Sequence, residues 1–273
     1  MKKLVVAVIA SSAGLFASAT TVTIKSGDVV ALTNELRNIK SNNTVIELSK
    51  GIYDLTPIKD SYMYTSDSYG KAILSTALSG KSGIKVKGGN PADVVLTVSG
   101  SSSRVFWVGG DDKGNGIYDL TITGGNASSL SGKSNYRGGG AAYLAKEAIV
   151  SNCVFYGNKA GRHGGAVGYG NSKAGSVWNC VFYGNTANGE YCASGCGAWV
   201  GGFARADFVN TSFTSNNWVS SRSEAYATAI QLYGQKNATF RGCDFRGNSG
   251  QGQIVHLEGN CNGAVFENCV FAG

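Results

Sequence analysis

The sequence predicts an all-β protein built as a parallel solenoid, and two observations support this fold class. First, the pattern apolar-x-Asn-Cys-x-Phe-x-x-Asn recurs, and a period of about 30 residues is typical of rungs that bury their apolar sides by stacking. Second, the 273 residues include 40 glycines and only 2 prolines, without a three-residue period, which favours tight turns and excludes collagen. The repeated segments are Ile149–Asn158, Val177–Asn185, Phe208–Asn216, Phe240–Asn248 and Phe266–Gly273.

Residues 1–19 are predicted to form a signal peptide. Lys2 and Lys3 give a basic start, an apolar run follows, and Ala17-Ser-Ala19 matches a small-x-small cleavage site. The prediction implies a secreted, extracellular or outer-membrane-surface protein, and the alternative is a buried N-terminal strand. No other run is long enough to span a bilayer, so no transmembrane segment is predicted.

The charge of the chain bears on its partners. Without residues 1–19, 22 basic and 17 acidic side chains remain, a net charge of about +5 that favours acidic partners such as uronate polysaccharides or an anionic surface. These charges form no Lys/Arg stripe and no nucleic-acid-binding motif, so no nucleic-acid partner is expected.

The N-terminal part, residues 20–57, is expected to cap the solenoid and to supply its first strands. Asp28 is a favourable helix N-cap, and Leu32 and Leu36 lie at helical spacing. A short capping helix is therefore predicted over about 29–40, where it covers the open first rung. Strands are expected over 44–48, 51–55, 84–86, 94–98, 105–108 and 117–123, with loops over 58–80 and 126–137.

Clear repeats cover residues 104–273, in the single β-helix domain expected over 20–273. Each rung is expected to hold three short strands, which run parallel to their equivalents about 4.8 Å away. Because no polar capping segment follows Phe271, we expect a C-terminal partner or a missing downstream domain to cover the last rung. The strand that precedes each Phe segment begins at Gly139, Gly164 and Gly197, with weaker copies at Thr228 and Ile254.

The paired motifs, such as Gly164-Gly-Ala-Val and Phe155-Tyr-Gly-Asn158, resemble those of a known family. They are similar to right-handed parallel β-helices of the pectate-lyase-like superfamily, and especially to the repeats of polymorphic outer-membrane proteins. The resemblance implies a single-stranded right-handed parallel β-helix, with a substrate cleft on the Gly-Gly-Ala face and its preceding loops. It also implies an asparagine ladder at one turn, formed by Asn152, Asn179, Asn210 and Asn268 with Gly242 as the exception.

Most of the seven cysteines fall in one column, two residues before each phenylalanine. Small apolar core residues are the favoured interpretation, with metal ligation or disulfides as the alternative, and the C-x-x-C spacing of metal sites is absent. Cys192 and Cys196 flank one short loop and are a disulfide candidate. An odd number leaves at least one thiol free or paired between molecules. The column comprises Cys153, Cys180, Thr211, Cys243 and Cys269.

Candidate ligand-binding residues are those expected to point outward. Tyr156 and Tyr183 project together and can stack on sugar rings, although ordinary cross-strand packing gives the same pattern. The best candidate groove lies over the Gly-Gly-Ala strands, with Val167, Trp199, Ile230 and Val255 taken as inward. Its outward members are Tyr143, Gln231 and His256 in one column and Tyr233 and Glu258 in the next, with Arg162, His163, Glu190, Tyr191, Arg222 and Glu224 on the loops.

Catalytic motifs are weak in this groove. A pectate lyase needs clustered acids for calcium and a base, but no three aspartates fall on neighbouring rungs. A polygalacturonase needs paired carboxylates, and its motifs are absent, since Gly161-Arg-His-Gly164 is a near miss and Asp111-Asp112 lies far upstream. The weak catalytic candidates are His256, Glu258, Arg222, Glu224 and His163, and for both histidines a surface polar role is the alternative.

The expected function is therefore that of a secreted or cell-surface β-helix protein. It would bind a polysaccharide or a host-cell-surface glycan, or mediate adhesion, without catalysis. The alternative is a polysaccharide lyase or glycoside hydrolase acting on acidic polysaccharide, and a third hypothesis is a passenger whose anchor lies beyond residue 273. No metal or cofactor is predicted, and calcium is implied only for a lyase.

Overall fold

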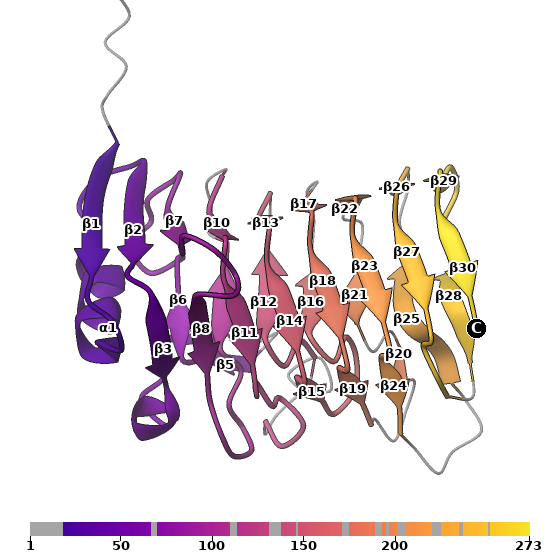
Figure 1. The fold of residues 1–273 in the computed structure, drawn as a ribbon, viewed down its shortest axis with the longest axis horizontal. Coiled ribbons are helices and arrows are strands. Elements are labelled where there is room, and N and C mark those ends of the chain that lie inside the picture. The colour runs from indigo at the N-terminus through magenta and orange to yellow at the C-terminus, as the bar shows by residue number, and fades with distance from the viewer. Residues whose placement is uncertain are drawn as a thin grey trace, which may run out of the picture.

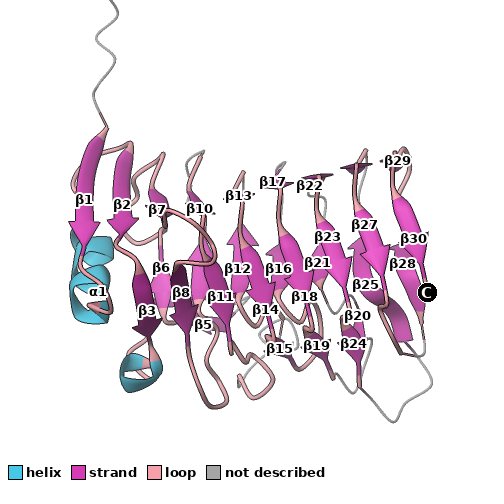
Figure 2. Cartoon of the chain, viewed as in Figure 1, coloured by secondary structure: helices cyan, strands magenta, loops and turns pink. Residues whose placement is uncertain are grey.

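The structure is a computed structural model, and it is a parallel β-helix (Figure 1). Figure 2 shows stacked strands along the molecule, and among the described residues helix occurs only near the N-terminal end. The described residues are 19–66, 70–109, 114–130, 138–145, 147–170, 175–188, 193–194, 197–200, 206–219, 225–234, 237–250 and 252–273.

Three long sheets form the walls of the β-helix, and each strand pairs in parallel with its equivalent one rung away. The first sheet contains β1 (Thr20–Ile24), β2 (Thr44–Leu48), β7 (Lys85–Lys87), β10 (Gly116–Tyr118), β13 (Ile149–Ser151), β17 (Gly175–Trp178), β22 (Ala206–Val209), β26 (Thr239–Arg241) and β29 (Val265–Glu267). The second sheet contains β3 (Gly51–Asp54), β8 (Val94–Thr97), β11 (Thr121–Thr123), β14 (Val154–Tyr156), β18 (Val181–Tyr183), β23 (Ser212–Thr214), β27 (Asp244–Arg246) and β30 (Val270–Ala272).

The third sheet and the smaller elements complete the rungs. The third sheet contains β6 (Leu74–Ser75), β9 (Phe106–Val108), β12 (Ala142–Ala145), β16 (Val167–Gly170), β20 (Ala193–Ser194), β21 (Ala198–Val200), β25 (Ala225–Tyr233) and β28 (Gln253–Glu258). A short sheet contains β15 (Lys159–Ala160), β19 (Thr186–Ala187) and β24 (Asn217–Trp218), and β4 (Tyr64–Ser66) pairs antiparallel with β5 (Gly70–Ala72). The helical elements are α1 (Val29–Asn38) and the 3-10 turn Thr56–Ile58.

The N-terminal cap confirms the predicted helix. The Asp28 carboxylate accepts a hydrogen bond from the Ala31 amide at 2.8 Å, and Leu32 and Leu36 are fully buried in the core. The expectation of a plain loop over 58–80 was wrong. That segment contains β4, β5 and β6, and β6 pairs with β9, so the third sheet begins before the clear repeats do.

Inward phenylalanines form the core of the later rungs. Phe155, Phe182, Phe213 and Phe245 are fully buried, and neighbouring rings stack with centroids 4.8–5.1 Å apart. Each stacked pair contributes about 0.5–1.5 kcal/mol beyond its buried area. The column ends at Phe271 on the last rung, whose side chain is 49% exposed.

The cysteine column lies inside, as its spacing predicts. Cys153, Cys180 and Cys243 are buried free thiols, and Cys269 on the last rung is half-buried. The Cys153 Sγ donates to the Ser151 carbonyl oxygen at 3.2 Å, so the thiol satisfies a backbone group at the corner. Burial raises the pKa of Cys153 above its ordinary value, which keeps this sulfur protonated and unreactive.

Two asparagine columns occupy successive corners. Asn152, Asn179, Asn210 and Asn268 have positive φ angles of 48–53°, which agrees with the predicted turn role, and Gly242 has a φ of 60°. The other column is buried and forms the stronger ladder, in which the Asn158 Nδ2 donates to the Asn185 Oδ1 at 3.1 Å. The same side-chain bond links Asn185 to Asn216 and Asn216 to Asn248, both at 3.0 Å.

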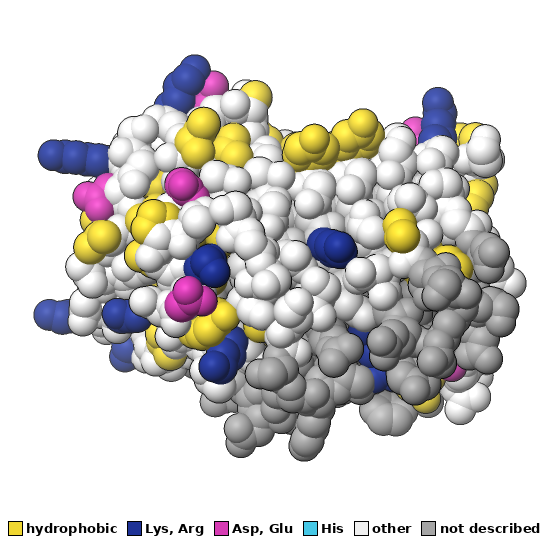
Figure 3. Space-filling model, turned by 90° about the horizontal axis from the view of Figure 1, so that it is seen from below, with side chains coloured by type: hydrophobic (Ala, Val, Ile, Leu, Met, Phe, Trp, Pro, Cys, Tyr) yellow, Lys and Arg dark blue, Asp and Glu magenta, His cyan; other side chains and the backbone are white. Residues whose placement is uncertain are grey.

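Surface charge is thinly spread on one long face of the molecule (Figure 3). Figure 3 shows one long face on which lysines, arginines and acidic side chains lie scattered among uncharged ones, without a continuous basic stripe on that face. In the described part of the chain, no helix has the length and apolar character that crossing a bilayer requires.

Candidate functional site

The predicted groove over the third sheet has a different register from the one expected. Trp199 pairs with Gly168 and Gln231, whereas Ala198 pairs with Val167 and Ile230. Taking Trp199 as a member of the inward column was therefore wrong by one residue. In the strand register, the positions of Tyr143, Gly168, Trp199, Gln231 and His256 form one column.

Tyr143 points out of the β-helix but is fully buried, so it offers no free surface to a ligand. Its ring stacks on Trp107 at 4.9 Å, and Trp107 stacks on Tyr64 of the β4–β5 hairpin at 4.2 Å. The Arg104 guanidinium lies 5.3 Å from the Tyr143 centroid. The hairpin thus covers the part of the third sheet where the groove was expected to begin.

Arg104 is a buried arginine that the sequence did not single out. Its Nε donates to the carbonyl oxygens of Gly138 and Gly139 at 3.1 and 3.0 Å, and its Nη1 donates to the Lys71 carbonyl at 3.3 Å. Desolvation lowers the pKa of Arg104 to about 10, so the guanidinium stays charged at neutral pH. Arg104 therefore ties the hairpin to Gly138 and Gly139, in the segment just before β12.

Three groove candidates do meet at the C-terminal end of the third sheet. The Gln231 Nε2 donates to the Glu258 Oε2 at 2.6 Å, and the His256 Nε2 lies 3.9 Å from the same oxygen. The His256 Nδ1 lies 3.0 Å from the Gln253 Oε1. Gln231 is 2% exposed and its Oε1 has no hydrogen-bond partner, whereas Tyr233 on the same strand is exposed.

The remaining predicted residues do not join this cluster in the described structure. His163 is buried rather than a surface residue, and its pKa is lowered to about 3 by desolvation and then by the Arg162 charge. Arg162 itself is half-buried. Outside the described residues lie Glu190, Tyr191, Arg222, Glu224, Asp111, Asp112 and the disulfide candidates Cys192 and Cys196.

Exposed aromatic side chains mark the outer face of the second sheet. Tyr156 and Tyr183 are 49% and 45% exposed, and their rings stack at 5.5 Å. They pair directly in register on β14 and β18, so the stack follows the axis of the β-helix. The pair provides an aromatic platform without polar groups of its own apart from the hydroxyls.

A hollow of about 460 Å³ lies on the outer face of the first sheet, and the sequence did not point to it. Its aromatic member is Trp178, which is 42% exposed. The hollow is lined by Ser176, Trp178, Asn179, Asp207, Val209, Asn210, Thr239 and Arg241.

Strand register places the walls of this hollow on three successive rungs. Trp178 pairs with Val209, and Val209 pairs with Arg241. The large side chains of Trp178 and Arg241 therefore stand on either side of the smaller Val209, two rungs or about 10 Å apart. That spacing leaves room for a group about the size of one sugar ring above Val209.

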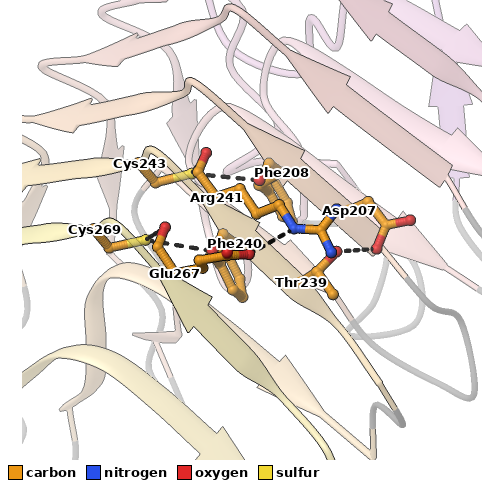
Figure 4. Close-up of polar contacts among 8 residues, drawn as sticks. All are labelled: Asp207, Phe208, Thr239, Phe240, Arg241, Cys243, Glu267 and Cys269. Atoms are coloured by element: carbon orange, nitrogen blue, oxygen red, sulfur yellow. Dashed lines mark hydrogen bonds and ion pairs between the residues drawn. The ribbon is translucent and has the colours of Figure 1, made fainter.

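Val209 forms the floor of the hollow, and polar groups lie on both sides of it. Figure 4 shows Arg241 paired with Glu267 and Thr239 bonded to Asp207 on adjoining strands. The Arg241 Nε lies 3.0 Å from the Glu267 Oε2, and the Thr239 hydroxyl donates to the Asp207 carboxylate. On the other side, the Asn210 Nδ2 donates to the Asn179 Oδ1 at 3.3 Å. One apolar floor, one aromatic wall and several convergent polar groups suit a small polar ligand.

Metal ligation finds little support in the described residues. No group of three or more His, Cys, Asp or Glu side chains there is arranged to hold a metal ion. The Gln231–Glu258–His256 cluster contains a single carboxylate, so it lacks the paired acids that glycoside hydrolysis uses.

Comparisons with known proteins leave the family open. No family model and no curated protein matches the chain. A solved structure described as Geobacillus virus E2 ORF18 is similar, with a TM-score of 0.46 and 13% sequence identity. The match covers 90% of this chain and 53% of the other, so the chain spans about half the length of that protein. A likeness this weak carries no conclusion about function.

Proposed function

We propose that the chain is a glycan-binding β-helix protein whose binding site is the hollow beside Trp178. The observation that carries the proposal is the exposed Trp178 ring standing over a floor edged by hydrogen-bonding side chains. An indole presents a flat apolar face, which suits the C–H face of a sugar ring, and it keeps an N–H donor at its edge. Asn179, Asn210 and Arg241 then supply hydrogen bonds for hydroxyl groups.

Binding measurements on the mature chain test this proposal. Residues 20–273 are screened on a glycan array, and hits are titrated by calorimetry with wild type, Trp178→Ala and Trp178→Phe. Trp178→Ala should weaken binding at least about tenfold, and Trp178→Phe should keep most of it, because buried aromatic contacts dominate such sites.

Tyr156→Ala serves as the matched control because Tyr156 is an aromatic residue of similar exposure on a different sheet. We expect it to leave the affinity within about twofold, below 0.5 kcal/mol. If Tyr156→Ala removes binding while Trp178→Ala does not, the site lies on the tyrosine platform and the hollow is the wrong location. Retention of no glycan at all would overturn the proposed function.

Polysaccharide cleavage is a second candidate function, and the contact between Gln231 and Glu258 beside His256 favours it. The resemblance of the repeats to those of pectate-lyase-like proteins, whose substrate cleft lies on the corresponding face, supports this proposal. We propose a test in which uronic-acid polymers are incubated with the chain, with and without calcium, and unsaturated or reducing products are measured. Product formed by wild type and lost in His256→Ala would support catalysis, whereas absence of product supports a binding role.

Export and surface display complete the proposal. Support comes from the basic start, apolar run and small-x-small site of residues 1–19, and from the resemblance of the repeats to polymorphic outer-membrane proteins. Expression of the full chain in its host, followed by fractionation and N-terminal sequencing, should give a protein that starts at residue 20 outside the cytoplasm. An intact N-terminus on a cytoplasmic protein would contradict the export proposal.

A further inference from the structure

Resting on the proposed function, we infer that the hollow beside Trp178 selects neutral sugars and discriminates against uronic acids. The net positive charge of the chain favours acidic partners, but the described charges beside the hollow disfavour an acidic ligand. Among the described residues that line it, Arg241 is basic and Asp207 is acidic. Glu267 lies beside them on the next strand, so these three described side chains together carry a formal charge of −1.

The position of Glu267 limits what Arg241 can offer. The Arg241 Nε already pairs with the Glu267 Oε2 at 3.0 Å, and both side chains are more than half exposed. A uronate carboxylate would have to displace Glu267 or bind beside it. A hydroxyl group needs neither, because the Nη donors of the guanidinium can serve a neutral acceptor while the pair stays intact.

The asparagine corner adds an acceptor to the hollow. In this column the Asn210 Nδ2 donates to the Asn179 Oδ1, one rung closer to the N-terminus. The next position is Gly242, which has no side chain to donate to the Asn210 Oδ1. A Cβ atom at Gly242 would stand 2.6 Å from that oxygen, which places the Asn210 carbonyl at the gap.

The hydrogen-bond balance therefore favours ligands rich in O–H donors. Asp207, Glu267 and the Asn210 carbonyl are acceptors, and they require donor groups on the ligand. Oxidation of a sugar at C6 replaces a hydroxyl donor by a carboxylate, which accepts hydrogen bonds and carries a negative charge. The change removes one favourable bond and adds repulsion from Asp207 and Glu267.

Matched oligosaccharides test the inference. Galactose and galacturonate trimers, glucose and glucuronate trimers, and mannose and mannuronate trimers are titrated into the mature chain at low salt. Within any pair that binds, the neutral trimer should bind at least about tenfold more tightly than the uronate trimer. Added salt should reduce this difference in affinity, because it screens exposed charges.

Charge variants assign the discrimination to named groups. Glu267→Gln and Asp207→Asn should each lower the ratio of neutral-trimer affinity to uronate-trimer affinity about threefold to tenfold, because each removes a negative charge beside the ligand. Glu47→Gln is the matched control, since Glu47 is an exposed acid on β2 of the same sheet, far from the hollow. It changes the net charge equally and should alter neither affinity.

The outcomes separate the two proposals. If a uronate trimer binds as tightly as its neutral partner and Trp178→Ala abolishes that binding, the inference is overturned and the proposed function stands. An equal gain in uronate affinity from Glu47→Gln and Glu267→Gln would also overturn it, because overall charge alone would then explain selectivity. If no trimer and no array glycan binds, both proposals fail.

Discussion

The buried asparagine ladder makes a quantitative prediction about stability, and Asn185→Ala is the sharpest test. Asn185 is fully buried. Its Nδ2 donates to the Phe155 carbonyl at 2.9 Å and to the Asn216 Oδ1 at 3.0 Å. Its Oδ1 accepts from the backbone amide and the side-chain amide of Asn158, at 3.0 and 3.1 Å.

Truncation to alanine removes all four of these bonds. The Asn158 backbone amide then loses the Asn185 Oδ1 as its acceptor. A hydrogen bond inside a protein contributes about 0.5–1.5 kcal/mol, so the loss of four gives an expected cost of about 4 kcal/mol, with a range of about 2–6. This is a large share of the roughly 5–15 kcal/mol by which a folded domain is usually stable.

Asn179→Gly is the matched control on the exposed ladder. Asn179 has a φ of 52°, which glycine adopts freely, and its side-chain bond to Asn210 is exposed. We expect a cost of about 1 kcal/mol or less for this change. Urea denaturation followed by circular dichroism gives both free energies. Because rungs unfold partly independently, amide exchange of the neighbouring rungs should show the same loss locally. A loss for Asn185→Ala no larger than that for Asn179→Gly would refute the reasoning.

Three further predictions concern titration and packing. Burial raises the pKa of Cys243 from 9.0 to about 11, so the contribution of its protonated thiol to stability is complete below pH 9 and is lost as the pH rises through about 11. In urea denaturation, Cys243→Ala should therefore reduce the fall in unfolding free energy between pH 9 and 11, and an unchanged fall contradicts the prediction. The pKa of His163 is lowered from 6.5 to about 3, so the contribution of its neutral imidazole to folding stability is present above pH 6.5 and is lost as the pH falls toward 3. NMR at pH 5 should show a neutral His163 ring, and a charged ring refutes the prediction. In Gly170→Ala the added methyl group would overlap the Tyr143 hydroxyl, so this variant should lose about 1–3 kcal/mol of unfolding free energy in thermal or urea unfolding. In the control, Gly89→Ala, the added methyl group meets no atom within 4 Å, and equal losses for the two variants would disprove the steric argument.

The inward columns were predictable because they repeat. Phe155 and Phe182 occupy the same place in successive repeats, and stacking them is the one way in which each rung buries its apolar side. The turn role of Asn152 and Asn179 was equally visible, since short amide side chains tolerate left-handed angles. In both cases the residue type and its regular spacing predict the same structural role.

Alternation failed where both faces of a strand carry apolar residues. Ala198 and Trp199 are neighbours, and the larger one was taken as inward, but the register puts Ala198 in the column of Val167. A shift of one residue exchanges the two faces of a strand, and size alone does not choose between them. Burial of Tyr143 was also invisible in its own repeat, because the β4–β5 hairpin that covers it comes from a distant part of the chain.

The hollow beside Trp178 left no repeated signal. Trp178, Val209 and Arg241 share one outward column, yet they differ in size, polarity and charge. An inward position is constrained to match its neighbours above and below, so its residue type recurs and can be recognised. An outward position is free to differ from rung to rung.

The solenoid, its capping helix and its core columns could thus be inferred from residue order alone, because stacking imposes one pattern on every rung. Which outward side chains are covered, and which stand together around a hollow, required the folded chain. Those features depend on contacts between rungs about thirty residues apart and on the β4–β5 hairpin, whose Tyr64 packs on Trp107 of the third sheet. Contacts of that kind leave no repeating pattern in the sequence, yet they bring together the residues of the candidate binding site.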